Sequence, residues 1–238
     1  MTAWYKKNPG LYRKEQAAIA LAQPGMALDI RPSGFRINQE QKWEQECAIA
    51  AGIYRLQAPN TMQYDYRIAV VLLDDYPNSP CVVYCNDPKL PIGNIDRHIL
   101  ANGQACLATP ADLMCRWKPE SGITGFLDEF VAPFLAWQVH FDAYGYPPPW
   151  GQRSHGIQGI IEFYAEMLDI PIEPYILKFI PLLAKKNLPK GHEPCPCGYG
   201  QRLRKCHFQS VKRARGFISW QIAISDLAAL PHNVMITA

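Results

Sequence analysis

Residues 66–80 read Tyr-Arg-Ile-Ala-Val-Val-Leu-Leu-Asp-Asp-Tyr-Pro-Asn-Ser-Pro, an apolar run that passes into acids and prolines. β-Branched residues favour strands, and clusters of Asp, Asn, Ser and Pro favour turns. The stretch therefore predicts a strand over Tyr64–Leu73 that ends in a turn. Similar extended runs at Trp43–Gln57 and Cys81–Cys85 flank it across short links that contain proline. Three sequential strands with short links predict an antiparallel meander.

Helical patterns precede and follow these strands. Apolar residues recur at helical spacing in Leu11–Ala22, Thr124–Tyr144 and Gly156–Leu168, so we predict a helix in each. Between the strands and the later helices lies a long irregular segment, Asn86–Trp117, and long loops of compact domains are usually functional. Helices segregated in sequence from an antiparallel sheet make the predicted fold class α+β.

The composition is that of a globular protein. Of 238 residues, 48% are hydrophobic and 19% are charged, which excludes a mostly disordered chain. No apolar stretch follows the N-terminal lysines, and the longest aliphatic run is Ile68–Leu73, so we expect neither a signal peptide nor a membrane span. We therefore expect a cytoplasmic protein whose eight cysteines are thiols or metal ligands rather than disulfides.

The charge is uneven along the chain. Ten lysines and arginines stand against one acid in residues 178–215, whereas residues 1–177 carry 14 basic and 19 acidic residues. The basic segment could meet an acidic protein or nucleic acid, or it could be a solvated face. In the part around the C-terminal cysteines, few aromatic residues are available to stack on bases, namely Tyr199 and Phe208, so nucleic acid is not among the partners we expect.

Four metal-binding side chains fall within thirteen residues, at Cys195, Cys197, Cys206 and His207. Four thiolate and imidazole ligands complete the tetrahedral shell of Zn²⁺ and leave no open position for water, so we predict a structural zinc ion. The spacing resembles the SEC-C motif, which commonly acts as a docking element. The alternative is a chance cluster of four reduced side chains.

The order of elements and the turn Tyr76–Pro80 resemble the ubiquitin-conjugating-enzyme family over about residues 10–170. In that family a strand runs into a Tyr-Pro-x-x-Pro turn, another strand follows, and a loop then carries the cysteine. The family's Gly-x-x-Cys-Leu is intact here at Gly103–Leu107. The resemblance implies a conjugating-enzyme-like meander with flanking helices, and Cys106 as the residue that forms a thioester.

One departure concerns the family's His-Pro-Asn triplet, which is missing. His98 occupies the position of its asparagine, eight residues before Cys106, and an imidazole could donate to an oxyanion or accept a proton. Asn102 is a further oxyanion candidate, although turn formation competes for its side chain. Each residue could instead have a purely structural role.

The closer likeness is to prokaryotic members encoded beside cGAS-like nucleotidyltransferases in the CBASS antiphage systems. These share an Arg-His before the cysteine and a Gly-x-Arg-Ser-His-Gly box, which here spans residues 151–156 and includes His155. The resemblance implies acyl transfer from a protein C-terminus, that of such a nucleotidyltransferase or of a ubiquitin-like protein, and makes His155 a site candidate. His155 could also merely cap and pack a helix.

The chemistry of acyl transfer fits Cys106. A thiolate attacks readily and leaves readily, and a loop position near Gly103 is accessible to a flexible peptide tail. The other cysteines of the body are expected to be core residues or spectators: Cys47, Cys81, Cys85 and Cys115. The alternative for Cys106 is a buried, inert thiol.

These observations predict a conjugating-enzyme-like domain at residues 1–172, a proline-rich linker with a short helix at 173–190, a zinc module at 191–210 and a basic, helical tail at 211–238. The leading hypothesis is an enzyme that forms a thioester on Cys106. The alternative is an inactive scaffold that binds and regulates its partner through the zinc module and the basic tail. The sequence has no Gly-rich ATP-binding loop, so we expect the acyl donor to be activated elsewhere.

Overall fold

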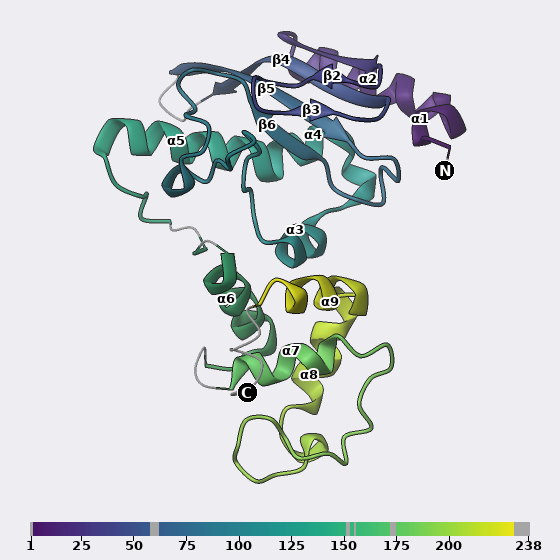
Figure 1. Cartoon of the computed structure of the whole chain (residues 1–238), viewed down its shortest axis with the longest axis vertical. Coiled ribbons are helices and arrows are strands. Elements are labelled where there is room, and N and C mark those ends of the chain that lie inside the picture. Colours follow the sequence, from purple (N-terminus) through teal and green to yellow (C-terminus); the bar gives the residue numbers. More distant parts are fainter. Residues whose placement is uncertain (1, 58–61, 151–152, 155, 172–174, 231–238) are drawn as a thin grey trace. The chain divides into compact units, whose positions relative to one another are not determined.

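The computed structural model describes residues 2–57, 62–150, 153–154, 156–171 and 175–230 (Figure 1). Contacts divide the chain into two units, each made of two segments. The first unit holds Met1–Leu107 and Trp117–Gly151, and the second holds Ala108–Arg116 and Gln152–Ala238. The sequence-based division at residue 172 differs from this one, because the apolar face of the helix at 156–168 packs with the C-terminal helices.

The first unit contains an antiparallel sheet of four strands in the order β1-β4-β5-β6. Its members are β1 (Met26–Arg31), β4 (Cys47–Gln57), β5 (Gln63–Leu72) and β6 (Val82–Cys85). The predicted meander is therefore confirmed as β4, β5 and β6. Trp43 belongs instead to a separate two-stranded hairpin of β2 (Phe35–Arg36) and β3 (Lys42–Trp43).

Consecutive residues are buried over 47–50 of β4 and 68–72 of β5, and because neighbouring residues of a strand point to opposite sides, both faces of the sheet are covered there. On one face, Ile49 and Val71 join a cluster against which Phe35 and Trp43 of the β2–β3 hairpin pack. Ala50 and Val70, which point to the other side, are also fully buried. The β-branched residues that predict these strands are therefore part of the core of the first unit.

The helices of the first unit are α1 (Trp4–Lys7), α2 (Pro9–Ala22), α4 (Gly122–Phe126) and α5 (Ala132–Tyr144), with short turns η1 (Ile95–Arg97) and η2 (Pro119–Ser121). A π-helical turn, η3 (Leu127–Val131), joins α4 to α5, so the helix predicted near Thr124–Tyr144 is confirmed as one continuous helical stretch. Buried Glu15 of α2 accepts the N–H of Ile123 at 2.9 Å, which ties α2 to the start of α4.

The second unit is helical. It contains α3 (Pro110–Arg116), α6 (Gly156–Leu168), α7 (Ile176–Leu183), η4 (Leu203–Lys205), α8 (Phe208–Phe217) and α9 (Trp220–Ala228). The predicted helix at Gly156–Leu168 is confirmed as α6, and its fully buried Tyr164 donates to the carboxylate of Asp226 in α9 at 2.9 Å. Within the described residues, no helix has the length and apolar content needed to cross a bilayer.

Candidate functional site

Cys106 ends a short hairpin that starts at His98 and extends the sheet beyond β6. The N–H of Cys106 donates to the carbonyl of His98 at 2.8 Å, which closes the two arms. Gln104 bridges Tyr84 of β6, and the N–H of Ala105 donates to the carbonyl of Val83 at 2.8 Å. A segment predicted to be irregular is thus held to the sheet edge by backbone hydrogen bonds, and it fixes the position of Cys106.

The turn of this hairpin uses Asn102 and Gly103. Gly103 has φ +81°, and a Cβ there would collide with the side-chain nitrogen of Asn38, so the position requires glycine. The Oδ1 of Asn102 accepts the N–H of Gln104 at 3.0 Å, and its carbonyl accepts Nδ2 of Asn38 at 3.1 Å. The side chain of Asn102 is therefore engaged in the turn, and its predicted oxyanion role stays a prediction.

The first arm of the hairpin is anchored to α5 by a buried polar network that the sequence did not reveal. Nε of Arg97 donates to Oε1 of Gln138 at 2.9 Å, and Nε2 of Gln138 donates back to the carbonyl of Arg97 at 2.9 Å. A second guanidinium nitrogen pairs with Asp142 at 2.7 Å. The sequence gives one hint of it, the polar Gln138 within an otherwise apolar helix face. The structure shows that Gln138 is fully buried, and a buried polar group needs such partners.

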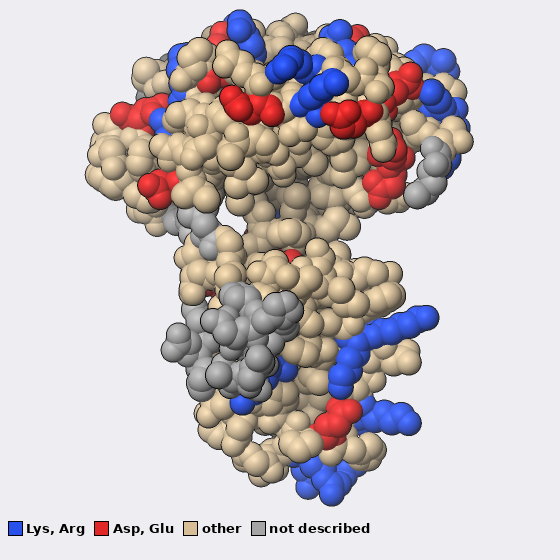
Figure 2. Space-filling model, in the orientation of Figure 1, with Lys and Arg blue, Asp and Glu red and all other residues tan. Residues whose placement is uncertain are grey.

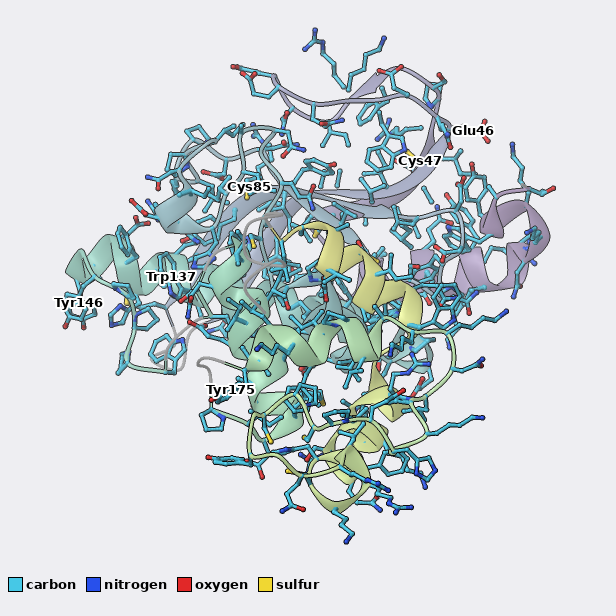
Figure 3. The ribbon with its side chains drawn as sticks, turned by 60° about the horizontal axis from the view of Figure 1, so that its bottom comes forward. Glu46, Cys47, Cys85, Trp137, Tyr146 and Tyr175 are labelled. Carbon is cyan, nitrogen blue, oxygen red and sulfur yellow. The ribbon has the colours of Figure 1, made fainter. Side chains whose placement is uncertain are left out.

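His98 follows directly and has a left-handed backbone, φ 56° and ψ 38°, a conformation in which histidine is enriched among non-glycine residues. Its ring is 6% exposed and lies edge-on to Trp137 of α5, with centroids 5.5 Å apart (Figure 3 labels Trp137). The main chain thus brings His98 beside Cys106, while its ring packs on an aromatic surface. Its predicted catalytic role stays a prediction.

We expect Gln138→Leu to destabilise the first unit by about 2 kcal/mol, because Arg97 loses a charge-assisted partner inside the protein. The urea midpoint measures this change. Gln45→Leu, at an exposed position of the same unit, is the matched control and should stay within about 0.5 kcal/mol. Equal midpoints for the two variants would show that the network contributes nothing.

All eight cysteines lie in the described residues, and outside the metal cluster two are partly exposed, Cys106 and Cys115. Burial raises the pKa of Cys106 above its ordinary value, so little thiolate forms at neutral pH. Burial likewise raises the pKa of Cys47 to about 11 and that of Cys85 to about 12. With Cys81, these two are buried in the core as predicted.

The Gly-x-Arg-Ser-His-Gly box is only partly visible. His155, with Gly151 and Gln152, lies outside the described residues. Within the second unit, Arg153 pairs with Asp112 of α3 at 3.1 Å and with Glu166 of α6 at 2.5 Å. The described part of the box therefore fastens α3 to α6.

The four predicted metal ligands come together. The Sγ atoms of Cys195, Cys197 and Cys206 and a ring nitrogen of His207 all lie within 4.8 Å of one another, so the cluster could hold a metal ion. Nδ1 of His207 is 3.2 Å from both Cys195 Sγ and Cys206 Sγ. Tetrahedral Zn–S and Zn–N bonds put neighbouring ligands roughly 3.5 Å apart, so the set fits one such ion.

The segment that carries this cluster, which we call the knuckle (residues 190–207), is part of the core of the second unit. Cys195 and Cys197 belong to the same buried cluster as residues of α6, α7, α8 and α9. Phe179 of α7 lies edge-on to His207 at 5.5 Å, and the ring of Tyr175, labelled in Figure 3, covers Gly198. The knuckle and the helices therefore stabilise each other.

Comparisons with known proteins show no family. No family model and no curated protein matches the chain. Among solved structures it is similar to the crystal structure of the yeast Vps23 UEV domain in complex with a Vps27 PSDP peptide. The two are 14% identical with a TM-score of 0.39, and the match covers 61% of this chain and 85% of that chain. A likeness of this size leaves the family open.

Proposed function

We propose that this chain is a ubiquitin-conjugating-like acyl carrier in which Cys106 forms a thioester with the C-terminus of a protein. The observation that carries the proposal is the hairpin of residues 98–106, which holds a partly exposed cysteine at the sheet edge through backbone hydrogen bonds. The Gly103–Leu107 motif supports the same assignment. Such a cysteine is reachable by a flexible polypeptide end.

The proposed chemistry has two steps. In the first, the thiolate of Cys106 attacks the carbonyl carbon of an acyl donor already activated as a thioester or acyl adenylate. The new C–S bond forms while the donor's bond to sulfur or phosphate breaks, and the leaving group departs with its electron pair. In the second, an amine attacks the thioester, a C–N bond forms, the Cys106 thiolate leaves, and a base takes the amine proton.

The proposal assigns a different role to each of three residues that accompany Cys106. His98 is the candidate for stabilising the oxyanion or accepting the proton, because the main chain places it beside the nucleophile. His155 is a candidate from its motif alone. Asn102 acts chiefly through the turn that its side chain closes.

The metal in this proposal is zinc, held by Cys195, Cys197, Cys206 and His207. Three thiolates and one imidazole suit Zn²⁺, and a complete four-ligand shell gives it a structural role. The ligand spacing supports a docking element of the SEC-C type.

The proposed donor is the C-terminus of a cGAS-like nucleotidyltransferase in cytoplasmic antiphage defence, or that of a ubiquitin-like protein. The motifs at residues 97–107 and 151–156 support the first of these.

The test is to incubate the zinc-loaded chain with a peptide α-thioester and follow the adduct by intact mass. We expect an adduct on Cys106 that hydroxylamine removes, and the same peptide with a free carboxylate should give none. Because burial raises the pKa of Cys106, the rate should rise roughly tenfold per pH unit between about pH 7 and 9. No adduct at any pH would count against acyl transfer.

A second candidate function is an inactive scaffold that binds and regulates the same partner. The raised pKa of Cys106 and the engagement of Asn102 in the turn both favour it, because neither residue is then poised for chemistry. In that case, partner binding and protection from phage should not depend on the sulfur of Cys106.

A further inference from the structure

The second unit carries a group of cations for which the described residues offer no acidic partner. Eight of the ten lysines and arginines in residues 178–215 are exposed. None of the ten forms an ion pair with a carboxylate in the part of the chain that the structure describes. In the lower part of Figure 2, blue side chains project from this unit with little red among them.

The fold holds several of these like charges close together. The N–H of Arg204 donates to the carbonyl of Gly191 at 3.0 Å, so the backbone of Arg204 and Lys205 lies near the segment that follows Lys190. Nη2 of Arg215 donates to the carbonyl of Lys186 at 3.2 Å. Surfaces usually intersperse the two signs of charge, because like charges repel. An anion bound over these side chains would relieve their mutual repulsion.

One aromatic side chain stands exposed in the same knuckle. Tyr199 is 79% exposed and lies between Gly198 and Gly200, both of which have positive φ. Arg202, also exposed, follows three residues later and bridges back to Pro194. An uncovered ring in a segment that also carries an exposed arginine can serve as a stacking platform for a nucleic-acid base, since every base has a π-face.

We propose that the knuckle and the adjoining start of α8 bind single-stranded nucleic acid, with lysines and arginines on the phosphates and a base stacked on Tyr199. The small number of aromatic residues argued against this partner in the sequence. Two structural observations reverse that expectation: the exposure of Tyr199 and the absence of acid partners for the cations among the described residues. An acidic polypeptide would meet the cations but would offer no base to Tyr199.

The test measures anisotropy of fluorescein-labelled oligo(U) and oligo(dT), about 20 nucleotides long, with the zinc-loaded full chain between about 50 and 200 mM KCl. The knuckle variant combines Lys190→Gln, Arg204→Gln and Lys205→Gln. It should reduce the slope of log K against log salt by about 2, since each phosphate contact on a single strand contributes about 0.7. The control combines Lys14→Gln, Lys42→Gln and Lys118→Gln, removes the same charge from exposed positions of the first unit, and should leave the slope unchanged.

Variants of Tyr199 make up the second part of the test. Tyr199→Ala should weaken oligonucleotide binding roughly tenfold and Tyr199→Trp should keep it, since stacking needs only a ring. Poly-glutamate of matched charge should compete poorly. Equal losses in both triple variants, or tight poly-glutamate binding that Tyr199→Ala does not change, would overturn the proposal, the latter in favour of an acidic protein. Cys106→Ala should bind oligonucleotide normally, so this result is independent of acyl transfer.

Discussion

Replacing Cys106 by alanine should abolish the acyl adduct completely, and replacing it by serine should trap a small amount of it. Alanine offers no nucleophile at the end of the hairpin. A serine hydroxyl is scarcely ionised near neutral pH and attacks far more slowly, but the ester it forms resists dithiothreitol, whereas the thioester does not. Intact mass before and after dithiothreitol measures both effects on the zinc-loaded chain.

Cys115→Ala is the matched control. Cys115 is the other partly exposed thiol outside the metal cluster, and its pKa is raised to about 11 by burial and by the neighbouring carboxylates of Asp112 and Asp226. Its loss should leave adduct formation at the level of the unmodified chain. An adduct that survives in Cys106→Ala, or disappears in Cys115→Ala, would contradict the assignment of Cys106. Cys106→Ala that still protects cells from phage would favour the scaffold function.

Loss of the metal should unfold the second unit and leave the first one folded. Cys195 and Cys197 are 5% and 2% exposed within the core that α6 to α9 share, so their thiolates need the ion to stay buried. Structural zinc contributes about 10–16 kcal/mol of binding free energy, which is as large as the whole stability of a typical domain. Cys195→Ser, or a strong chelator, should therefore remove amide-exchange protection from α7, α8 and α9.

The first unit is the internal control in the same experiment, since it shows whether unfolding is confined to the second unit. Amides of β4 and β5 should keep their protection, because no cluster residue belongs to that unit. Glu193→Gln changes a charged residue of the knuckle that is not a ligand, and it should leave protection and zinc content unchanged. Zinc added back after chelation should restore α7 to α9, and magnesium should not. Full protection of the second unit without bound metal would show that the four side chains form an ordinary core.

The sequence predicted those parts of the fold whose cause is local. The strands β4, β5 and β6 are rich in aliphatic and aromatic residues, and α6 has a clear apolar face. The edge strand β1 was missed, because Asp29 and Arg31 interrupt its short apolar pattern. These two residues pair with each other at 2.9 Å, and the strand gains its order from the long-range register with β4.

For the candidate sites too, the sequence predicted the features that depend on residues close together in the chain. The four candidate metal ligands stand within thirteen residues, so their convergence could be predicted, while the packing of α7 on the knuckle could not. Around Cys106, motif spacing identified the cysteine and its neighbour His98. The buried Arg97–Gln138 contact that anchors the hairpin joins residues 41 apart, and although Gln138 is unusual on its apolar helix face, no local pattern identifies Arg97 as its partner.

Because α3 belongs to the second unit but lies in sequence between two segments of the first, neither unit is encoded by one continuous stretch of the gene. The chain leaves the first unit after Leu107, forms α3 within the second, and returns at Trp117. A recombination breakpoint near residue 151 would separate α3 from the rest of the second unit. The carboxylate of Asp112, which is 8% exposed, would then lose its ion pair with Arg153. Exchange of the second unit between genes at a single junction is therefore disfavoured, and we expect Cys106 and the knuckle to be inherited together.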